Sequence, residues 1–331
     1  MRADVADLMV GPRLANRSSS FPPPRDESFG VNMNCHLVDV MTVDGLRLHG
    51  AWHSPTARGP LTGLVVFTVH GVGGNFYSSH LFRAGTERLK ELGAHVVWTN
   101  NRGHDGWTSG PNGPKRGCGA SYEQVADCRL DLTAWVRWSE QHLDATQVVY
   151  WGHSLGAIKV IFASSVGHEE ADATGHSHAA NAATAVIASS PPLLSYSRLI
   201  QEAKGEQLIA NVQRAEAALN EHDEGLLHVN YPFRLPITPR AYLDKYGPLE
   251  RYDVVRLLPH VTRPLLLTYG EMELTQPAPP FANAEALLAS AARPGQDWRC
   301  EAVARANHFY AQGSDELASV VENFLLEYCS G

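Results

Sequence analysis

The chain has 331 residues and a formal net charge of −8, with 44% hydrophobic and 19% charged residues. This balance is typical of a globular protein with a large core, and an acidic chain without a basic cluster is not expected to bind nucleic acid. The five cysteines are scattered and form no Cys-x-x-Cys pair, so neither a disulfide framework nor a zinc ribbon is indicated. Free thiols in a reducing cytoplasm are the simpler expectation.

The N-terminal residues 1–34 are expected to form an arm without a core of its own, because three consecutive serines are followed by Pro22, Pro23 and Pro24. The first ten residues include charged side chains and no long apolar stretch follows them, so no signal peptide is expected. No window reaches the roughly 18 apolar residues that a membrane-spanning helix needs. We therefore expect a cytoplasmic protein without a membrane span.

From residue 37 onward, strand patterns alternate with helical patterns. Residues 37–42 and 46–53 flank an Asp-Gly turn and predict a hairpin. Apolar runs predict strands over 64–69, 94–99, 147–151, 185–189, 265–269 and 298–304. Helices are expected over 77–92, 122–142, 157–166, 282–292 and 315–328, and a loop is expected over 106–119. This alternation predicts an α/β fold with a mostly parallel sheet flanked by helices.

Residues 193–260 depart from the alternation, and they are too many for a simple connection between two strands. We expect them to form an inserted, mainly helical cap over the carboxyl ends of the strands. The core domain would then comprise residues 35–192 and 261–331. Tyr231 and Phe233 of the cap are expected to contact the substrate.

The strand predicted over 147–151 ends in Gly152-His153-Ser154-Leu155-Gly156, and a helical pattern follows. A strand, a sharp turn and a helix expose a serine hydroxyl at the top of a sheet and at the N-terminus of a helix. Glycines suit such a turn because a side chain would crowd it. Ser154 is therefore a candidate nucleophile.

Four motifs occur in the order that is typical of one family, and on them the chain resembles the α/β-hydrolases over about residues 35–331. They are His70-Gly71-Val72-Gly73-Gly74, Asn101-Arg102-Gly103-His104-Asp105, Gly152-His153-Ser154-Leu155-Gly156 and Ala306-Asn307-His308. The resemblance implies an eight-stranded sheet whose second strand is antiparallel, and a triad in the order nucleophile, acid, histidine.

The resemblance also implies roles for individual residues. Ser154 would be the nucleophile, His308 would be the general base, and the N–H groups of Val72 and Leu155 would form the oxyanion hole. The acid should follow the strand over 265–269, where the family pattern falls on Glu273. Glu271 is the alternative acid.

This constellation favours a serine hydrolase that cleaves a carboxylic ester through an acyl-enzyme. A thioesterase, a lactone-forming enzyme or an acyltransferase would use the same residues on a small-molecule acyl ester or thioester. A serine peptidase is a further possibility. A receptor-like protein that keeps the fold with little turnover is an alternative of another class. No cofactor is expected because nucleotide-binding motifs are missing, and the loop with His168, His176 and His178 is expected to be solvated, so no metal site is expected.

Overall fold

The structure is a computed structural model that describes residues 34–110, 113–165, 182–275 and 279–331. The arm expected over residues 1–34 lies outside the described residues except for Asn34. The loop with His168, His176 and His178 also lies outside them. The remaining chain forms the unit described below.

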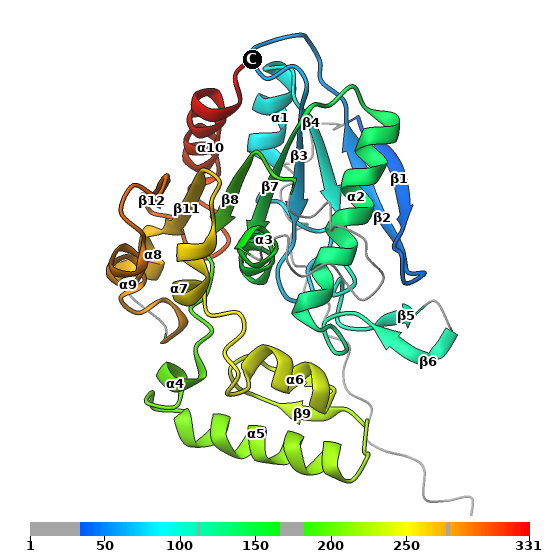
Figure 1. Ribbon diagram of the computed structural model, residues 1–331, viewed down its shortest axis with the longest axis vertical. Coiled ribbons are helices and arrows are strands. Elements are labelled where there is room, and N and C mark those ends of the chain that lie inside the picture. The colour runs from blue at the N-terminus through cyan, green and yellow to red at the C-terminus, as the bar shows by residue number, and fades with distance from the viewer. Residues whose placement is uncertain (1–33, 111–112, 166–181, 276–278) are drawn as a thin grey trace, which may run out of the picture. The chain divides into compact units, whose positions relative to one another are not determined.

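Eight strands form one sheet in the order β1-β2-β4-β3-β7-β8-β11-β12 (Figure 1). They are β1 (His36–Met41), β2 (Arg47–His53), β3 (Leu64–Val69), β4 (His95–Thr99), β7 (Gln147–His153), β8 (Ala185–Ser189), β11 (Leu265–Gly270) and β12 (Trp298–Val303). Strand β2 runs antiparallel to both β1 and β4, and the other neighbouring pairs are parallel. The expected sheet, including its antiparallel second strand, is confirmed.

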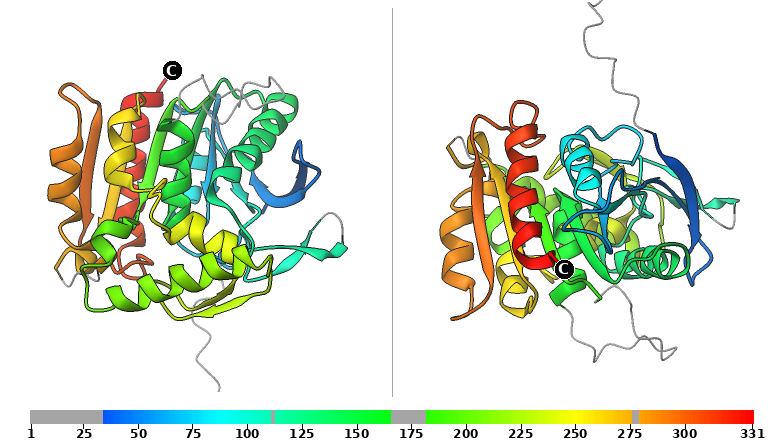
Figure 2. Two further views of the ribbon diagram at one scale, coloured as in Figure 1. Left: turned by 60° about the horizontal axis from the view of Figure 1, so that its bottom comes forward. Right: turned by 90° about the horizontal axis from the view of Figure 1, so that it is seen from above.

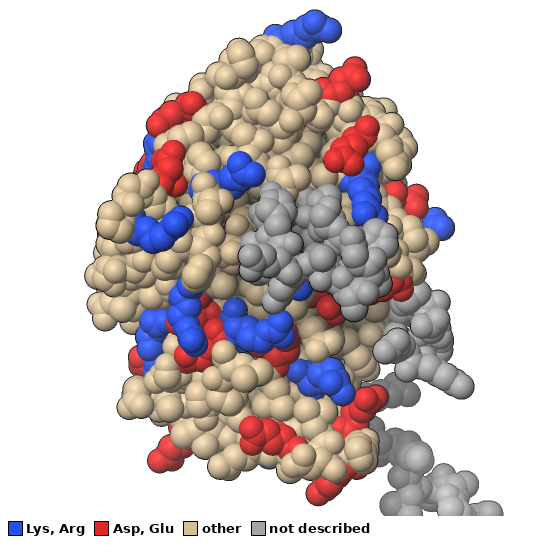
Figure 3. All heavy atoms as spheres, viewed as in Figure 1, with Lys and Arg blue, Asp and Glu red and all other residues tan. Residues whose placement is uncertain are grey.

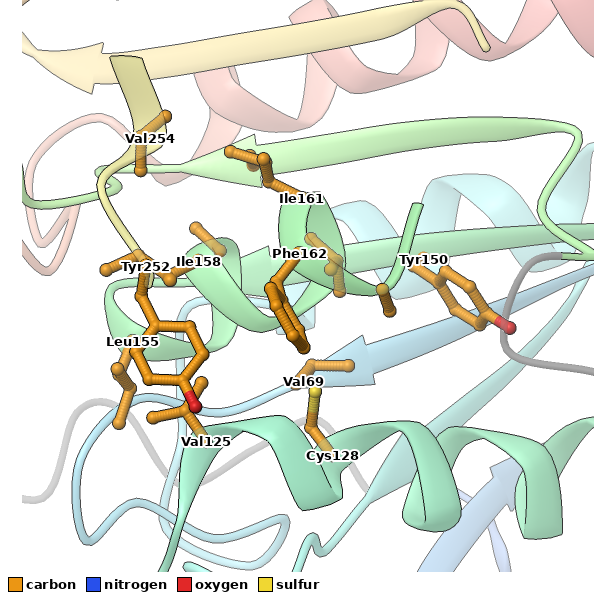
Figure 4. Close-up of a cluster of buried hydrophobic side chains, with 14 of the residues drawn as sticks. Val69, Val125, Cys128, Tyr150, Leu155, Ile158, Ile161, Phe162, Tyr252 and Val254 are labelled. Atoms are coloured by element: carbon orange, nitrogen blue, oxygen red, sulfur yellow. The ribbon is translucent and has the colours of Figure 1, made fainter. Parts of the chain in front are cut away.

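Helices cover both faces of this sheet (Figure 2). They include α1 (Arg83–Glu91), α2 (Cys128–His142), α3 (Leu155–Ser165), α9 (Ala284–Ala291) and α10 (Ser314–Cys329). On one face α1 packs against α10, whose buried Leu317, Val321 and Phe324 recur at the spacing of an amphipathic helix. On the other face α3 and α2 enclose the cluster in Figure 4, where Phe162 lies edge-on to Tyr252. Because both faces are covered, every residue of β3 is buried and its sequence is continuously apolar apart from Thr68.

The segment between β8 and β11 is mostly helical and also contains a short hairpin. It comprises α4 (Tyr196–Leu199), α5 (Gly205–Asn220), β9 (Leu227–Val229), β10 (Leu235–Ile237), α6 (Pro239–Tyr246), α7 (Val254–Leu257) and a 3₁₀ turn (Leu258–His260). Helix α6 begins where its sequence predicts, since Thr238 caps the N–H of Ala241 and Pro239 occupies the first turn. In Figure 1, α4, α5 and α6 lie beyond the carboxyl ends of the parallel strands.

Buried charges join this insertion to the sheet domain. Glu123 forms ion pairs with Lys159 of α3 and with Lys245 of α6, and all three side chains are buried. The Lys245 ammonium also donates to the carbonyls of Ala120 (3.2 Å) and Glu123 (2.5 Å). Burial opposes ionisation of Glu123, but the two lysines hold its pKa below the usual range. On the surface, by contrast, acidic and basic side chains are interspersed on the face drawn in Figure 3.

Two helices begin later than the sequence predicts, because side-chain hydrogen bonds hold the backbone that precedes them. The helix expected over 77–92 begins only at Arg83, since Asn100 binds the N–H of Phe76 and Asn75 binds that of Ser78. The helix expected over 122–142 begins at Cys128 after a 3₁₀ turn (Val125–Asp127). There, the N–H groups of residues 125 and 126 donate to side chains of the insertion.

The loop expected over 106–119 instead contains a hairpin of β5 (Thr108–Gly110) and β6 (Gly113–Cys118). The sequence of this loop is polar and rich in glycine, so it shows no apolar strand pattern. The two strands pair with each other, outside the main sheet. Among the described helices, none is long and apolar enough to cross a membrane.

Candidate active site

The register of the central strands brings their carboxyl ends to one edge of the sheet. Gly152 of β7 pairs with Val69 of β3 on one side and with Ala188 of β8 on the other. Thr268 of β11 pairs in turn with Ser189 of β8. The residues that follow these strands therefore meet, as expected for the ligand-binding edge of an open α/β sheet.

Ser154 occupies the sharp turn between β7 and α3. Its φ of +57° lies in the left-handed region, which costs a non-glycine residue energy and is held here by the surrounding structure. A Cβ atom on Gly156 would lie 2.0 Å from the carbonyl oxygen of Val69, so only glycine fits this crossing. The turn thus requires the glycine that the sequence supplies, and it presents the Ser154 hydroxyl at the start of α3.

His308, Glu273 and Ser154 form a chain of hydrogen bonds. His308 Nε2 lies 3.1 Å from Ser154 Oγ, and His308 Nδ1 lies 2.7 Å from Glu273 Oε1. A carboxylate only accepts, so Nδ1 carries the proton and Nε2 is left to accept one from the serine. The structure brings together the three residues that were expected to meet, although they are far apart in the sequence.

The two candidate acids lie in the short helix α8 (Glu271–Thr275) and point in different directions. Glu273 is 6% exposed and faces His308, whereas Glu271 is exposed and accepts the backbone N–H of Arg305 at 2.7 Å. The expectation that Glu271 is the alternative acid does not fit this geometry. Residues two apart in a helix do not share a face, and this separates the two carboxylates.

The far oxygen of Glu273 is bound by a buried polar network that sequence reasoning missed. Ser190 Oγ donates to Glu273 Oε2 at 2.5 Å, and the N–H of Gly270 donates to the same oxygen at 2.8 Å. A hydrogen bond of 2.9 Å also joins Ser190 Oγ to the hydroxyl of Tyr310, which lies 3.0 Å from Thr268 Oγ1. The only sequence signal was Ser190, which directly follows the strand predicted over 185–189.

Two further histidines support the backbone around the site. His153 Nε2 donates to the carbonyl of His308 at 2.7 Å, which ties the serine turn to the histidine loop. Burial is the main cause that lowers the pKa of His153 to about 4, so its ring is neutral at neutral pH. His70 accepts the N–H of Asn101 at Nε2 (3.1 Å) and contacts the carbonyl of Gly71 through Nδ1 (2.9 Å).

Burial likewise lowers the pKa of His70 to about 3. The neutral His70 ring therefore links the loop after β4 to the loop after β3.

The loop after β3 lies directly against Ser154. A Cβ atom on Gly71 would lie 2.9 Å from Ser154 Cβ, and Gly74 N–H donates to the Gly71 carbonyl at 3.1 Å to close a turn around Val72. Leu155 is the first residue of α3, where N–H groups have no acceptor within their own helix. Val72 and Leu155 both line the cavity described next.

A cavity of about 650 Å³ opens above Ser154 and His308. It is bounded by the loop after β3, by the insertion and by residues 280–281, 309 and 311. Its apolar walls include Val72, Leu155, Leu194, Phe233, Phe281 and Phe309. Among the described residues, no Asp, Glu, Lys or Arg lines it, so the site is suited to an uncharged ligand.

The two aromatic residues expected to contact the substrate lie in different environments. Phe233 lines the cavity and is 52% exposed. Tyr231 is 7% exposed, is not among the residues that line the cavity, and packs within the insertion. Its carbonyl accepts hydrogen bonds from Tyr242 and Asn211. This position does not support the expectation for Tyr231, because its ring belongs to the core of the insertion.

The described part of the chain contains no group of three or more His, Cys, Asp or Glu side chains arranged to hold a metal ion. The five cysteines, all of them described, form no disulfide bond.

Comparison with known proteins agrees with this architecture. Residues 65–163 match the family model of the α/β-hydrolase fold. That range includes most of β3, the loop after it, the serine turn and most of α3. The chain therefore has the α/β-hydrolase fold. No curated protein matches it by sequence.

Solved structures of esterases and hydrolases share the fold at low sequence identity. Est1E from Butyrivibrio proteoclasticus, solved with ferulic acid, is 16% identical with a TM-score of 0.58, covering 88% of this chain and 99% of its own. The esterase Pf2001 from Pyrococcus furiosus is 18% identical with a TM-score of 0.53, covering 90% and 92%. The α/β-hydrolase GrgF from Penicillium sp. sh18 is 13% identical with a TM-score of 0.63, covering 90% and 100%.

Proposed function

We propose that the protein is a serine hydrolase that cleaves uncharged carboxylic esters through an acyl-enzyme. The observation that carries this proposal is the hydrogen-bonded chain from Ser154 through His308 to Glu273 at the floor of an apolar cavity. The esterases that share the fold support the choice of an ester over other substrates.

In the first half-reaction, Ser154 Oγ attacks the ester carbonyl while His308 Nε2 takes the hydroxyl proton. Glu273 accepts the Nδ1–H, fixes the tautomer of His308 and stabilises the imidazolium that forms. The same proton then passes from Nε2 to the departing alkoxide, so the alcohol leaves neutral. Deacylation repeats these steps with water in place of the serine hydroxyl.

The negative charge on the carbonyl oxygen would be stabilised by the N–H groups of Val72 and Leu155. Leu155 begins α3, and the dipole of that helix favours negative charge at its N-terminus. Donors that are already in place before the reaction stabilise the oxyanion without reorganisation, and each such donor typically contributes about 10²–10³-fold to turnover.

The cavity indicates the size and polarity of the substrate. Its 650 Å³ is about twenty times the volume of ~30 Å³ that a water molecule occupies in the liquid. A substrate of medium size with an apolar acyl or alcohol group would fit, and Phe233 of the insertion would form part of its wall. A charged group would lose its hydration against these walls without gaining an ionic partner.

The test is a panel of p-nitrophenyl esters and matched thioesters of increasing chain length, with the hemisuccinate ester as the charged member. The wild type should hydrolyse the uncharged members, and Ser154→Ala should reduce kcat by about 10⁴–10⁶-fold while the protein stays folded. A fluorophosphonate should label the wild type and not the variant. Adding an alcohol as a competing acceptor would reveal acyl transfer. Near-wild-type turnover by Ser154→Ala would rule out the proposed nucleophile.

A further inference from the structure

The loop after β4 carries a carboxylate in an uncommon backbone conformation. Asp105 has a φ of +57°, in the left-handed region that aspartate and asparagine tolerate better than other non-glycine residues. Neither its side chain nor its backbone is among the groups that line the cavity. Its hydrogen bonds are instead directed at the neighbouring loop after β3.

The two carboxylate oxygens and the backbone N–H of Asp105 each bind a different residue of the loop after β3. Oδ1 accepts from Asn75 Nδ2 at 2.7 Å, and Oδ2 accepts from the hydroxyl of Tyr77 at 2.5 Å. The backbone N–H of Asp105 donates to the carbonyl of Gly74 at 3.1 Å. A Cβ atom on Gly73 would lie 3.6 Å from the carbonyl oxygen of Asp105, so Gly73 lies close to the Asp105 backbone. Gly74, Asn75 and Tyr77 are thus all hydrogen-bonded to Asp105.

The residues that Asp105 binds lie just after Val72 in the sequence. The turn that contains Val72 is closed by the hydrogen bond from Gly74 N–H to the Gly71 carbonyl. Gly74, which closes the turn, is the same residue whose carbonyl Asp105 holds. Gly71, at the other end, lies against Ser154. The direction of the Val72 N–H therefore depends on where Asp105 holds Gly74.

The ionised state of Asp105 strengthens this arrangement. Burial alone would raise its pKa, but hydrogen bonds from Tyr77, His104 and Asn75 bring the pKa below the usual range. His104 Nδ1 lies 2.7 Å from the same oxygen that accepts from Tyr77. Hydrogen bonds to an ionised acceptor are roughly twice as strong as neutral ones. A neutral amide in this place would hold the loop less firmly.

We propose that Asp105 is a positioning residue that orients the oxyanion loop, residues 71–77, so that the N–H of Val72 points at the reacting carbonyl oxygen. The proposal rests on the proposed ester hydrolysis. It assigns to Asp105 an effect on the transition state and not on substrate binding, since the oxyanion exists only after attack.

The test is Asp105→Asn, which keeps a residue that tolerates the left-handed backbone and removes the charge and one acceptor oxygen. We expect kcat to fall by about 10- to 100-fold while KM stays within about twofold. This decrease in kcat is no larger than the decrease that follows removal of one oxyanion donor. The inhibition constant of a trifluoromethyl ketone, whose adduct with Ser154 carries an oxyanion, should rise by the same factor as kcat/KM falls.

Asp44→Asn is the matched control. Asp44 is also a loop carboxylate that accepts hydrogen bonds, from Thr42 (2.6 Å) and Arg102 (3.0 Å), and Thr42 and Arg102 help to lower its pKa against the effect of burial. Its hydrogen-bond and ion-pair partners among the described residues lie outside the oxyanion loop, and its replacement should change kcat and the inhibition constant little even if it lowers the melting temperature.

If Asp105→Asn does not fold, Tyr77→Phe and Asn75→Ala test the positioning role in its place, because each removes one hydrogen-bond donor to Asp105. Each should lower kcat and inhibitor affinity together, by a smaller factor. Unchanged kcat in the folded variants, or a rise in KM with an unchanged inhibition constant, would overturn the positioning role alone. A wild type without Ser154-dependent hydrolysis would instead overturn the proposed function, and the role of Asp105 with it.

Discussion

Glu273 Oε1 lies 2.7 Å from His308 Nδ1, and this contact selects one of two neighbouring glutamates as the partner of the histidine. Glu271 points away and binds the backbone of Arg305. The two residues differ by two positions in α8, which places their side chains on different faces of the helix.

Glu273→Gln should therefore lower kcat far more than Glu271→Gln. Loss of the charge next to Nδ1 leaves the imidazolium unstabilised and permits the wrong tautomer, which costs about 10⁴-fold in comparable triads. Glu271→Gln still offers an oxygen to the Arg305 N–H and should change kcat little. Steady-state rates of both variants on the best ester of the panel check this ranking, and the reverse order would transfer the acid role to Glu271.

Ser190→Ala should lower both activity and stability. The substitution leaves Glu273 Oε2 with only the N–H of Gly270, and leaving a buried acceptor incompletely satisfied costs about 1–3 kcal/mol. Because the carboxylate is then less firmly held, kcat should fall as well.

Ser189→Ala is its matched control. The Ser189 hydroxyl is also buried, but it bonds to Trp151 and Thr268 and not to Glu273. Chemical denaturation and kcat measured together should show lost stability in both variants and lost activity only in Ser190→Ala. Equal kcat values for the two variants would mean that Ser190 has no specific effect on the acid.

Replacement of the two aromatic residues of the insertion should have opposite effects. Phe233→Ala removes half-exposed cavity wall, so the ranking of esters by chain length should change while the melting temperature moves little. Tyr231→Ala removes a buried ring and should destabilise the protein by about 3–5 kcal/mol with little change in the ranking. A changed ranking in Tyr231→Ala and not in Phe233→Ala would contradict the assigned positions.

His53→Phe should make the protein less sensitive to acid. His53 is buried, neither of its ring nitrogens has a hydrogen-bond partner among the described residues, and burial is the main cause that lowers its pKa to about 4. In the unfolded chain its pKa is about 6.5, so between pH 6.5 and 4 the unfolded state binds a proton that the folded state does not. Unfolding free energy therefore falls as the pH falls through that window, and the loss is complete below pH 4.

Without His53, the slope of the unfolding free energy against pH should decrease. One proton is the largest possible difference, which corresponds to about 1.4 kcal/mol per pH unit. Urea unfolding at several pH values between 7 and 4 measures the slope. His49→Gln, at an exposed position on the same strand β2, is the control and should leave the slope unchanged. An unaltered slope in His53→Phe would show that His53 binds protons equally in both states.

The sequence alone determined the sheet and the place of the serine. Buried strands such as β3 are apolar throughout because helices cover both faces, and such runs are visible without coordinates. The turn at Ser154 is equally local, since Gly152 and Gly156 must both lack a side chain for β7 to turn sharply into α3.

Only the tertiary structure decided how side chains from separate segments meet. It selected Glu273 over Glu271, placed Phe233 on the cavity and Tyr231 in the insertion core, and brought Ser190 to the acid. It also delayed the start of the helix expected over 77–92 to Arg83, because Asn100 and Asn75 bind the backbone N–H groups of Phe76 and Ser78. Periodicity in a sequence reports burial and turns within one element, whereas these contacts depend on strand register and helix rotation, which arise only when the elements pack.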